Sequence, residues 1–430
     1  MLNVIKKKLG SGMRRDIVWT FSIQILIMLS SFAINKLLAN RMSIDDFGQY
    51  NVIKRSVQVL SFVMLAGAGI AIPRYIPIYR NSTPPKRILP LLCASIIYII
   101  GISIIVVLVC TLFSAQMQDI IIGKNDNTTL FIIALAYAFV LAMAQYAFAY
   151  YRGIGNFKWY NSTQLAMQLS IIVPLVLLPI VTVKYVFASW LLITILLVAY
   201  LLGRELWLFI RRNGAFKLES SLKSHLATII KYSSGRLIAD FFQFSLSAFP
   251  LIYISNNLDL QTTAYFSVGI FFVTMVTPIF SFMGIILLPY ISQSIARNEM
   301  ANADRLVNRL ALIYIGTSLL FTGFIYVFTR FLTTLLFTSD YIVTTDLTHI
   351  IILSILPQAL YMLYRNTIDA VSVIPYNAII LGLCFAAMVA SFMFSTTLNQ
   401  FAWAYVGVSV VQGFVSLIIW KCIKMRVSPK

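Results

Sequence analysis

Residues 88–113 read ILPLLCASIIYIIGISIIVVLVCTLF and contain no charged side chain. Hydrophobic residues make up 60% of the whole chain and charged residues only 11%. In lipid, backbone polar groups must be satisfied within their own segment, and about 20 apolar residues make one crossing helix. The sequence therefore predicts an all-α integral membrane protein with twelve transmembrane helices, at 17–39, 48–72, 88–113, 129–151, 164–183, 185–207, 231–255, 264–290, 307–329, 347–371, 375–395 and 400–422.

Lysine and arginine gather in every second gap between these spans. If both termini are cytoplasmic, the cytoplasmic tails and gaps hold 24 of the 33 basic residues, and the opposite gaps hold only Arg41, Lys124, Lys184 and Arg330. Because cytoplasmic loops are enriched in lysine and arginine, this split supports both the even number of spans and the orientation. The net charge of +19 is then explained by attraction to an anionic inner leaflet, and no nucleic acid, metal or cofactor is expected as a partner.

The chain also divides into two halves that resemble each other. The longest polar stretch predicts a cytoplasmic linker at 211–230, between a six-helix lobe at 1–210 and a second at 231–430. Similar residues recur at similar spacing in both lobes: Asp16, Tyr50 and Pro73 against Lys231, Tyr265 and Pro289, and Tyr151-Arg152-Gly153 against Tyr364-Arg365-Asn366. An even number of helices in each repeat predicts two bundles related by a pseudo-two-fold axis along the membrane normal.

Besides charged residues at the span ends that we assign to the gaps and tails, seven charged residues are intramembrane candidates: Lys36, Lys54, Arg55, Arg236, Asp240, Arg365 and Asp369. Each costs at least ~2.5–3.5 kcal/mol near the bilayer centre, so it must face a wet cavity, pair with an opposite charge or reach an interface. Lys36 lies close enough to a helix end to reach the interface. The i,i+4 spacing of Arg236 with Asp240, and of Arg365 with Asp369, is compatible with structural ion pairs and equally with a substrate site.

Lys54 and Arg55 are different, because they are adjacent, alike in sign and without an acid nearby in the sequence. They point about 100° apart on a helix, so both can border a broad cavity but cannot share one helix contact. A guanidinium fork and an ammonium point charge suit phosphate oxygens. We therefore interpret the pair as a site for a negatively charged substrate.

Four stretches resemble the landmarks of a known family. They are LLANRMSIDDFGQYNVI at 37–53, AGAGIAIPRYIP at 66–77, YYRGIGNFKWYN at 150–161 and AYFSVGIFF at 264–272. Together with the span count and the position of the linker, they are similar to the bacterial polysaccharide transport family. The resemblance covers essentially the whole chain.

The resemblance implies the two-lobed fold of multidrug and toxin extrusion transporters and lipid II flippases. It implies that an undecaprenyl-diphosphate-linked oligosaccharide, such as an O-antigen unit, is flipped from the cytoplasmic to the periplasmic face of the inner membrane by alternating access. A polysaccharide polymerase and a chain-length regulator are further candidate partners, beside membrane lipids. The candidate substrate-binding residues are Lys54, Arg55, Arg236, Asp240, Arg365 and Lys36, and the candidates for ion coupling are Asp240 and Asp369.

Two other classes of function are weighed against this one. A cation-coupled multidrug exporter of the same fold would need acids in its cavity, whereas the charges inside these spans are mostly basic. A membrane-embedded enzyme would need carboxylates at a membrane surface, and no nucleotide-binding Gly-Lys-Ser/Thr sequence occurs in the chain. The sequence therefore predicts a transporter and not an enzyme.

Overall fold

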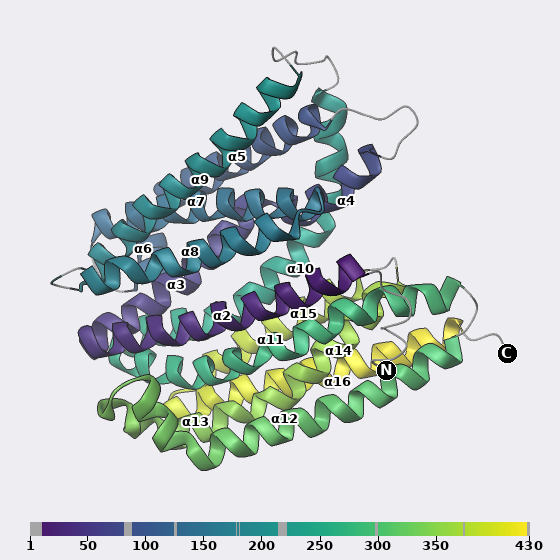
Figure 1. Ribbon diagram of the computed structural model, residues 1–430. Helices are drawn as coiled ribbons and strands as arrows, with labels where there is room; N and C mark the ends of the chain where they lie inside the picture. The colour runs from purple at the N-terminus through teal and green to yellow at the C-terminus, as the bar shows by residue number, and fades with distance from the viewer. Residues whose placement is uncertain are drawn as a thin grey trace. The chain divides into compact units, whose positions relative to one another are not determined.

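The computed structural model describes residues 11–80, 88–123, 127–177, 179, 181–213, 222–296, 300–372 and 375–427. Within these ranges the chain is helical and contains no strand (Figure 1). Eleven helical segments of the described residues are long and apolar enough to cross a membrane. The chain is therefore a multi-pass membrane protein of the all-α class, as the sequence predicts.

The residues form two compact units, each with its own internal packing. Unit 1 comprises Met1–Arg41, Val57–Ile121 and Asn125–Leu237, and unit 2 comprises Met42–Ser56, Ile122–Lys124 and Ile238–Lys430. Two long helices pass from one unit to the other: α3 (Ile44–Leu65) begins in unit 2 and ends in unit 1, and α10 (Leu222–Asn257) does the reverse. The division at 211–230 remains a prediction, and residues 214–221 of that linker lie outside the described residues.

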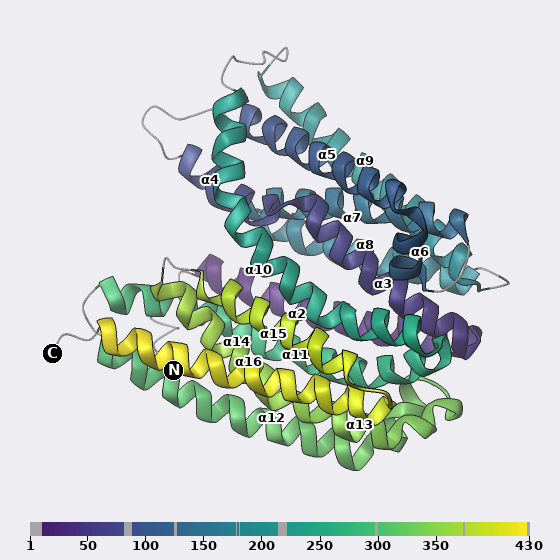
Figure 2. The same ribbon diagram turned by 180° about the vertical axis from the view of Figure 1, so that it is seen from behind.

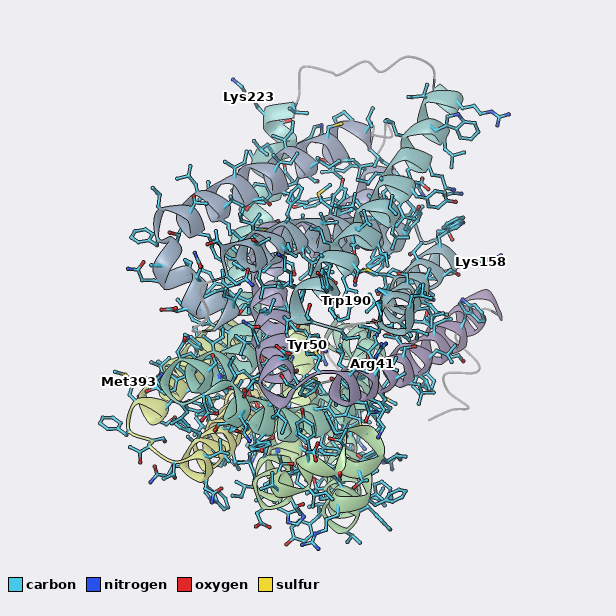
Figure 3. All side chains as sticks on the ribbon, turned by 90° about the vertical axis from the view of Figure 1, so that its left-hand side faces the viewer. Arg41, Tyr50, Lys158, Trp190, Lys223 and Met393 are labelled. Atoms are coloured by element: carbon cyan, nitrogen blue, oxygen red, sulfur yellow. The ribbon has the colours of Figure 1, made fainter. Side chains whose placement is uncertain are left out.

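Unit 1 is built around α7 (Thr128–Gly153), which packs against three other helices. These are α4 (Ala68–Arg80), α8 (Phe157–Leu177) and α9 (Val183–Asn213). The buried Trp190 of α9, labelled in Figure 3, donates its indole N–H to the backbone oxygen of Ile171, 3.0 Å away, and so fastens α9 to α8. The remaining helices of the unit are α2 (Ser11–Arg41), α5 (Leu89–Leu112) and α6 (Ser114–Ile122).

Polar side chains join α2 to α8. Gln24 donates to Gln164 at 2.9 Å, Asn161 donates to Thr20 at 2.8 Å and Gln168 donates to Ser31 at 3.0 Å. Small-residue packing and side-chain hydrogen bonds are the usual means of holding helices together in lipid, where apolar burial gives little net attraction. These bonds explain how a helix with several amide side chains is accommodated in an otherwise apolar protein.

Unit 2 is arranged around α14 (Ile355–Val371), which packs against α11 (Leu260–Ala296), α12 (Met300–Leu336) and α16 (Leu398–Val427) (Figure 2). Short helices η1 (Ser339–Thr344), α13 (Thr345–Ile351) and η2 (Ile352–Ser354) lead into α14, and α15 (Tyr376–Met393) packs on α16. The same scheme thus occurs in both units, because α4, α7 and α9 are packed as α11, α14 and α16 are. This agreement supports the internal repeat that the sequence predicts.

The twelve predicted spans all correspond to helices, but some boundaries differ. The span predicted at 48–72 is a pair of helices, α3 and α4, that extends to Arg80. The span predicted at 164–183 is shifted, because α8 begins at Phe157 and ends at Leu177. Helix α8 is the predicted span that is not among the eleven apolar ones, since its amides lower its hydropathy.

Candidate functional site

The N-terminal half of α3 carries Lys54 and Arg55 within unit 2. Lys54 is ten residues beyond the start of α3, which corresponds to about 15 Å along the helix. Both side chains are half-buried, and neither forms an ion pair with any described carboxylate. The Lys54 ammonium instead lies 5.3 Å from the centre of the Tyr50 ring, a cation–π distance. Two half-buried cations with no ion-paired acid among the described residues form the central feature of this site.

The stretch Phe47-Gly48-Gln49-Tyr50 fixes how this part of α3 is held. A Cβ atom on Gly48 would lie only 2.0 Å from the backbone oxygen of Leu260, so α3 and the start of α11 touch backbone to backbone. Gln49 donates its side-chain amide to the Ile122 oxygen at 3.0 Å. Tyr50, labelled in Figure 3, is fully buried one turn before Lys54. The family-like motif is therefore a packing motif that sets the position of the two cations.

Aromatic rings surround the same turn of α3. The Phe47 ring centre lies 6.0 Å from that of Phe337 and 5.6 Å from that of Tyr341, both with edge-to-face geometry. Phe337 and Tyr341 are themselves almost fully buried. Such pairs contribute about 0.5–1.5 kcal/mol beyond the area that they bury, so they add to the rigidity of this anchor.

Arg55 faces residues of two further helices of unit 2. It lies within electrostatic range of the Tyr405 hydroxyl of α16. That hydroxyl accepts a hydrogen bond of 3.0 Å from the amide of Gln358 on α14. The Gln358 amide also lies 3.3 Å from the Ser409 hydroxyl. A network of uncharged polar groups thus extends from Arg55 onto α14 and α16.

Arg365 of α14 pairs with Asp240 of α10, with 3.5 Å between Nη2 and Oδ1. Asp240 is buried, with 7% of its surface exposed. Arg365 also donates a hydrogen bond of 3.4 Å to the side-chain oxygen of Gln243 on α10. Arg365 forms no ion pair with Asp369, four residues later, among the described side chains. Asp369 instead accepts a hydrogen bond of 2.8 Å from Asn377 of α15.

Arg236 and Lys36 belong to other parts of the sequence than the residues above. Both belong to the parts of α10 and α2 that lie in unit 1, whereas Lys54, Asp240 and Arg365 belong to unit 2. The side chain of Arg236 lies outside the described part of the structure, so its predicted pairing with Asp240 stays a prediction. Lys36 is half-buried in α2.

A polar stripe on α14 was missed by sequence reasoning. Ser354, Gln358, Tyr361, Arg365 and Asp369 follow at spacings of four, three, four and four, which places them along one face of the helix. Gln358 also borders a void of about 10 Å³ between α11 and α14, roughly the space for a single water molecule. The sequence would have revealed the stripe, because these polar residues follow at helical spacing within the apolar span predicted at 347–371.

Breaking the ion pair between α10 and α14 gives a first prediction. Asp240→Asn leaves the Arg365 charge half-buried beside a neutral amide, so we expect the free energy of unfolding to fall by about 1–3 kcal/mol. The double variant Asp240→Asn with Arg365→Gln removes both charges and should recover part of this loss. Thermal unfolding of the purified protein in detergent measures both effects. Asp369→Asn, at an exposed side chain, is the control and should melt like the wild type; equal loss at the two acids would contradict the pairing.

Comparisons with known proteins agree with the fold described above. The computed fold resembles an inward-facing multidrug resistance MATE family transporter of the MOP superfamily, with a TM-score of 0.74, 12% identity, and 96% of this chain and 98% of that chain covered. It also resembles the lipid II flippase MurJ in an inward closed conformation, with a TM-score of 0.70, 12% identity, and 96% and 89% covered. At such identities the likeness concerns the fold.

A third similar structure is a MOP superfamily transporter from Pyrococcus furiosus, whose binding pocket is described as having reversed polarity that suggests a different function. Its TM-score is 0.62 at 13% identity, with 96% of this chain and 94% of that chain covered. No curated protein sequence matches the chain. The sequence model of the family described as "Polysaccharide biosynthesis protein" matches residues 13–295, about two-thirds of the chain. The chain therefore belongs to the polysaccharide biosynthesis protein family, within a fold shared with transporters and flippases.

Proposed function

We propose that this protein flips an undecaprenyl-diphosphate-linked oligosaccharide from the cytoplasmic to the opposite leaflet of a bacterial inner membrane by alternating access. The observation that carries the proposal is the pair Lys54 and Arg55, half-buried in an apolar helix with no carboxylate partner among the described residues. Such charges are costly in a membrane and are retained where a function uses them. A diphosphate supplies the negative charge that the helix bundle itself does not.

The family match and the structural likeness to a lipid II flippase support the same class of substrate. The polar groups around Arg55 are hydroxyls and amides, which bind a phosphate-sugar junction without competing for the positive charge. Arg365 differs from Arg55, because Asp240 already balances its charge. We therefore assign the diphosphate contact to Lys54 and Arg55, with Arg236 as a further candidate, and leave Arg365 a mainly structural role.

The orientation, coupling and partners are part of the proposal. The distribution of lysine and arginine supports cytoplasmic termini. Asp369 is exposed and bound only through a neutral amide, so it suits a proton carrier better than the ion-paired Asp240. A surface-polysaccharide polymerase and a chain-length regulator are the proposed partners on the far side of the membrane, where the flipped oligosaccharide would be consumed.

A cation-coupled multidrug exporter is the second candidate, favoured by the likeness to a MATE transporter. Organic cations require carboxylates that are free to receive them, whereas Asp240 is ion-paired with Arg365. The reversed pocket polarity named for the Pyrococcus furiosus transporter indicates that pocket charge can separate functions within one fold. The basic residues here favour an anionic substrate.

Reconstitution tests the two candidates together. Lipid-linked oligosaccharide, extracted from a host strain that lacks the gene, is incorporated into vesicles with or without the purified protein. We expect the protein to bring the inner-leaflet oligosaccharide within reach of a membrane-impermeant glycosidase. An unchanged accessible fraction, together with proton-driven movement of ethidium in the same vesicles, would replace the flippase proposal by the exporter.

A further inference from the structure

Unit 1 contains a cavity whose lining is partly polar and partly apolar. It has a volume of about 260 Å³ and lies at the junction of α3 and α4, beside α7 and α8. All of its lining residues fall within Val57–Ile121 and Asn125–Leu237, so it belongs to a single compact unit. Its size falls just below the roughly 300–1,000 Å³ of sites for drug-sized ligands, which suits one small ring and not a whole oligosaccharide or a lipid tail.

The wall of the cavity includes a break in a membrane-spanning helix. Ala66 has φ of 51° and Gly67 has φ of 74°, so the chain leaves the helical conformation for two residues between α3 and α4. A positive φ at alanine is strained, and such strain is usually kept where a function needs it. A Cβ atom on Gly67 would meet the Ser233 side chain at 2.9 Å, so a glycine is required there on two grounds. Irregular backbone at membrane depth is tolerated only inside protein or against a wet cavity.

Polar side chains with spare hydrogen-bonding capacity line the rest of the cavity. Arg152 of α7 donates to the Gly69 oxygen at 2.8 Å and meets no carboxylate among the described residues. The side-chain amide of Gln145 and the hydroxyl of Tyr160 have no hydrogen-bond partner among the described residues. Gln164 accepts a bond from Gln24 through its oxygen, which leaves its own N–H groups available. The cavity therefore offers side-chain donors and acceptors on two helices, α7 and α8.

Aromatic and apolar faces alternate with these polar groups. Phe62, Phe148 and the ring of Tyr160 contribute to the lining. Amides, a hydroxyl and a guanidinium beside flat rings match a pyranose, whose hydroxyls both donate and accept and whose C–H faces are apolar. A bare phosphate would accept hydrogen bonds from Arg152, from the amide N–H groups and from the hydroxyl, but it would leave the amide oxygens and the rings without a role.

We propose that this cavity binds one sugar ring of the transported molecule, which makes it the element of unit 1 that recognises the oligosaccharide. The proposal rests on the flippase function, since the sugar arrives attached to a lipid diphosphate. Gln145 and Gln164 hold the ring hydroxyls, Tyr160 contacts both a hydroxyl and a ring face, and Arg152 lies beside the broken helix. Recognition of charge and recognition of sugar are thereby assigned to different sets of residues.

Binding to the protein in lipid nanodiscs tests the assignment. The two probes are undecaprenyl diphosphate without sugar and the lipid-linked oligosaccharide accumulated by a strain that lacks the gene. For the double variant Gln145→Leu with Tyr160→Phe, we expect about tenfold weaker binding of the sugar-bearing probe, the effect of losing two hydrogen bonds. Binding of the sugar-free probe should stay within about twofold.

Gln168→Leu is the matched control, because Gln168 lies on α8 one turn after Gln164 but is bonded to Ser31 and does not line the cavity. It should leave both affinities unchanged. Tyr160→Phe alone, which removes a single oxygen atom, keeps the test valid if the double variant does not fold; it should weaken only the sugar-bearing probe. Equal weakening of both probes, or a wild-type protein that binds them equally well, would overturn the sugar assignment. A wild-type protein that binds neither probe would instead overturn the flippase function.

Discussion

Replacement of both Lys54 and Arg55 by glutamine is expected to abolish transport of the lipid-linked substrate while the protein stays folded. A charged hydrogen bond contributes about 1.5–3 kcal/mol, so loss of two contacts to a diphosphate predicts a rate at least about a hundredfold lower. The free energy of unfolding of the double variant should rise or stay unchanged. Each cation is half-buried in an apolar helix without a carboxylate partner among the described residues, so its removal relieves the cost of keeping a charge in the membrane.

Two measurements on the same preparation therefore check this prediction: the flipping rate in vesicles and the melting temperature in detergent. Lys158→Gln with Lys223→Gln is the control, because both lysines are exposed at helix ends (Figure 3) and the net change in charge is the same. The control should transport at the wild-type rate. A Lys54 and Arg55 double variant that transports normally would remove these residues from the substrate site, and one that fails to fold would give them a structural role.

The second large effect is expected at Gly48. Its missing side chain allows α3 to approach the Leu260 carbonyl, and a Cβ atom would lie 2.0 Å from that oxygen and 2.9 Å from its carbon. Backbone atoms cannot turn away as a side chain can, so the two helices must separate. We expect Gly48→Ala to lower the free energy of unfolding by about 1–3 kcal/mol and Gly48→Val to reduce the yield of folded protein further.

Gly101 offers a matched control in α5. No atom lies within 4 Å of a Cβ placed there, and glycine inside a helix costs about 0.5–1 kcal/mol relative to alanine. Gly101→Ala should therefore melt at the wild-type temperature or slightly above it. Thermal unfolding of both alanine variants is the measurement, and a Gly48→Ala protein as stable as Gly101→Ala would show that α3 does not need this close contact.

The helical spans were predictable because length and apolar content are local properties. The span expected at 88–113 corresponds to α5, Leu89–Leu112, almost residue for residue. The span expected at 164–183 was misplaced for a non-local reason. Asn161, Gln164 and Gln168 find hydrogen-bond partners on α2, about 140 residues earlier, and hydropathy cannot register such partners.

The residues of the candidate site were predictable from the sequence, but the ion pairs that they form were not. Lys54 and Arg55 stand out in the sequence because no acid is near them, and the structure adds none among the described side chains. The spacing of Arg365 and Asp369 was compatible with an ion pair and equally with a substrate site, and in the structure Arg365 pairs with Asp240 on another helix. Spacing along one helix restricts which contacts are possible, whereas tertiary packing selects between them. The packing role of Gly48 likewise requires knowledge of where Leu260 lies.

The amide bonds between α2 and α8 have a consequence for biosynthesis. Helix α8 is the span with the weakest apolar character, so its release from the translocon into lipid depends on a partner for its glutamines. That partner is synthesised some 140 residues earlier. Helix α2 must therefore be available to α8 when α8 enters the bilayer, which couples the order of translation to the completion of unit 1.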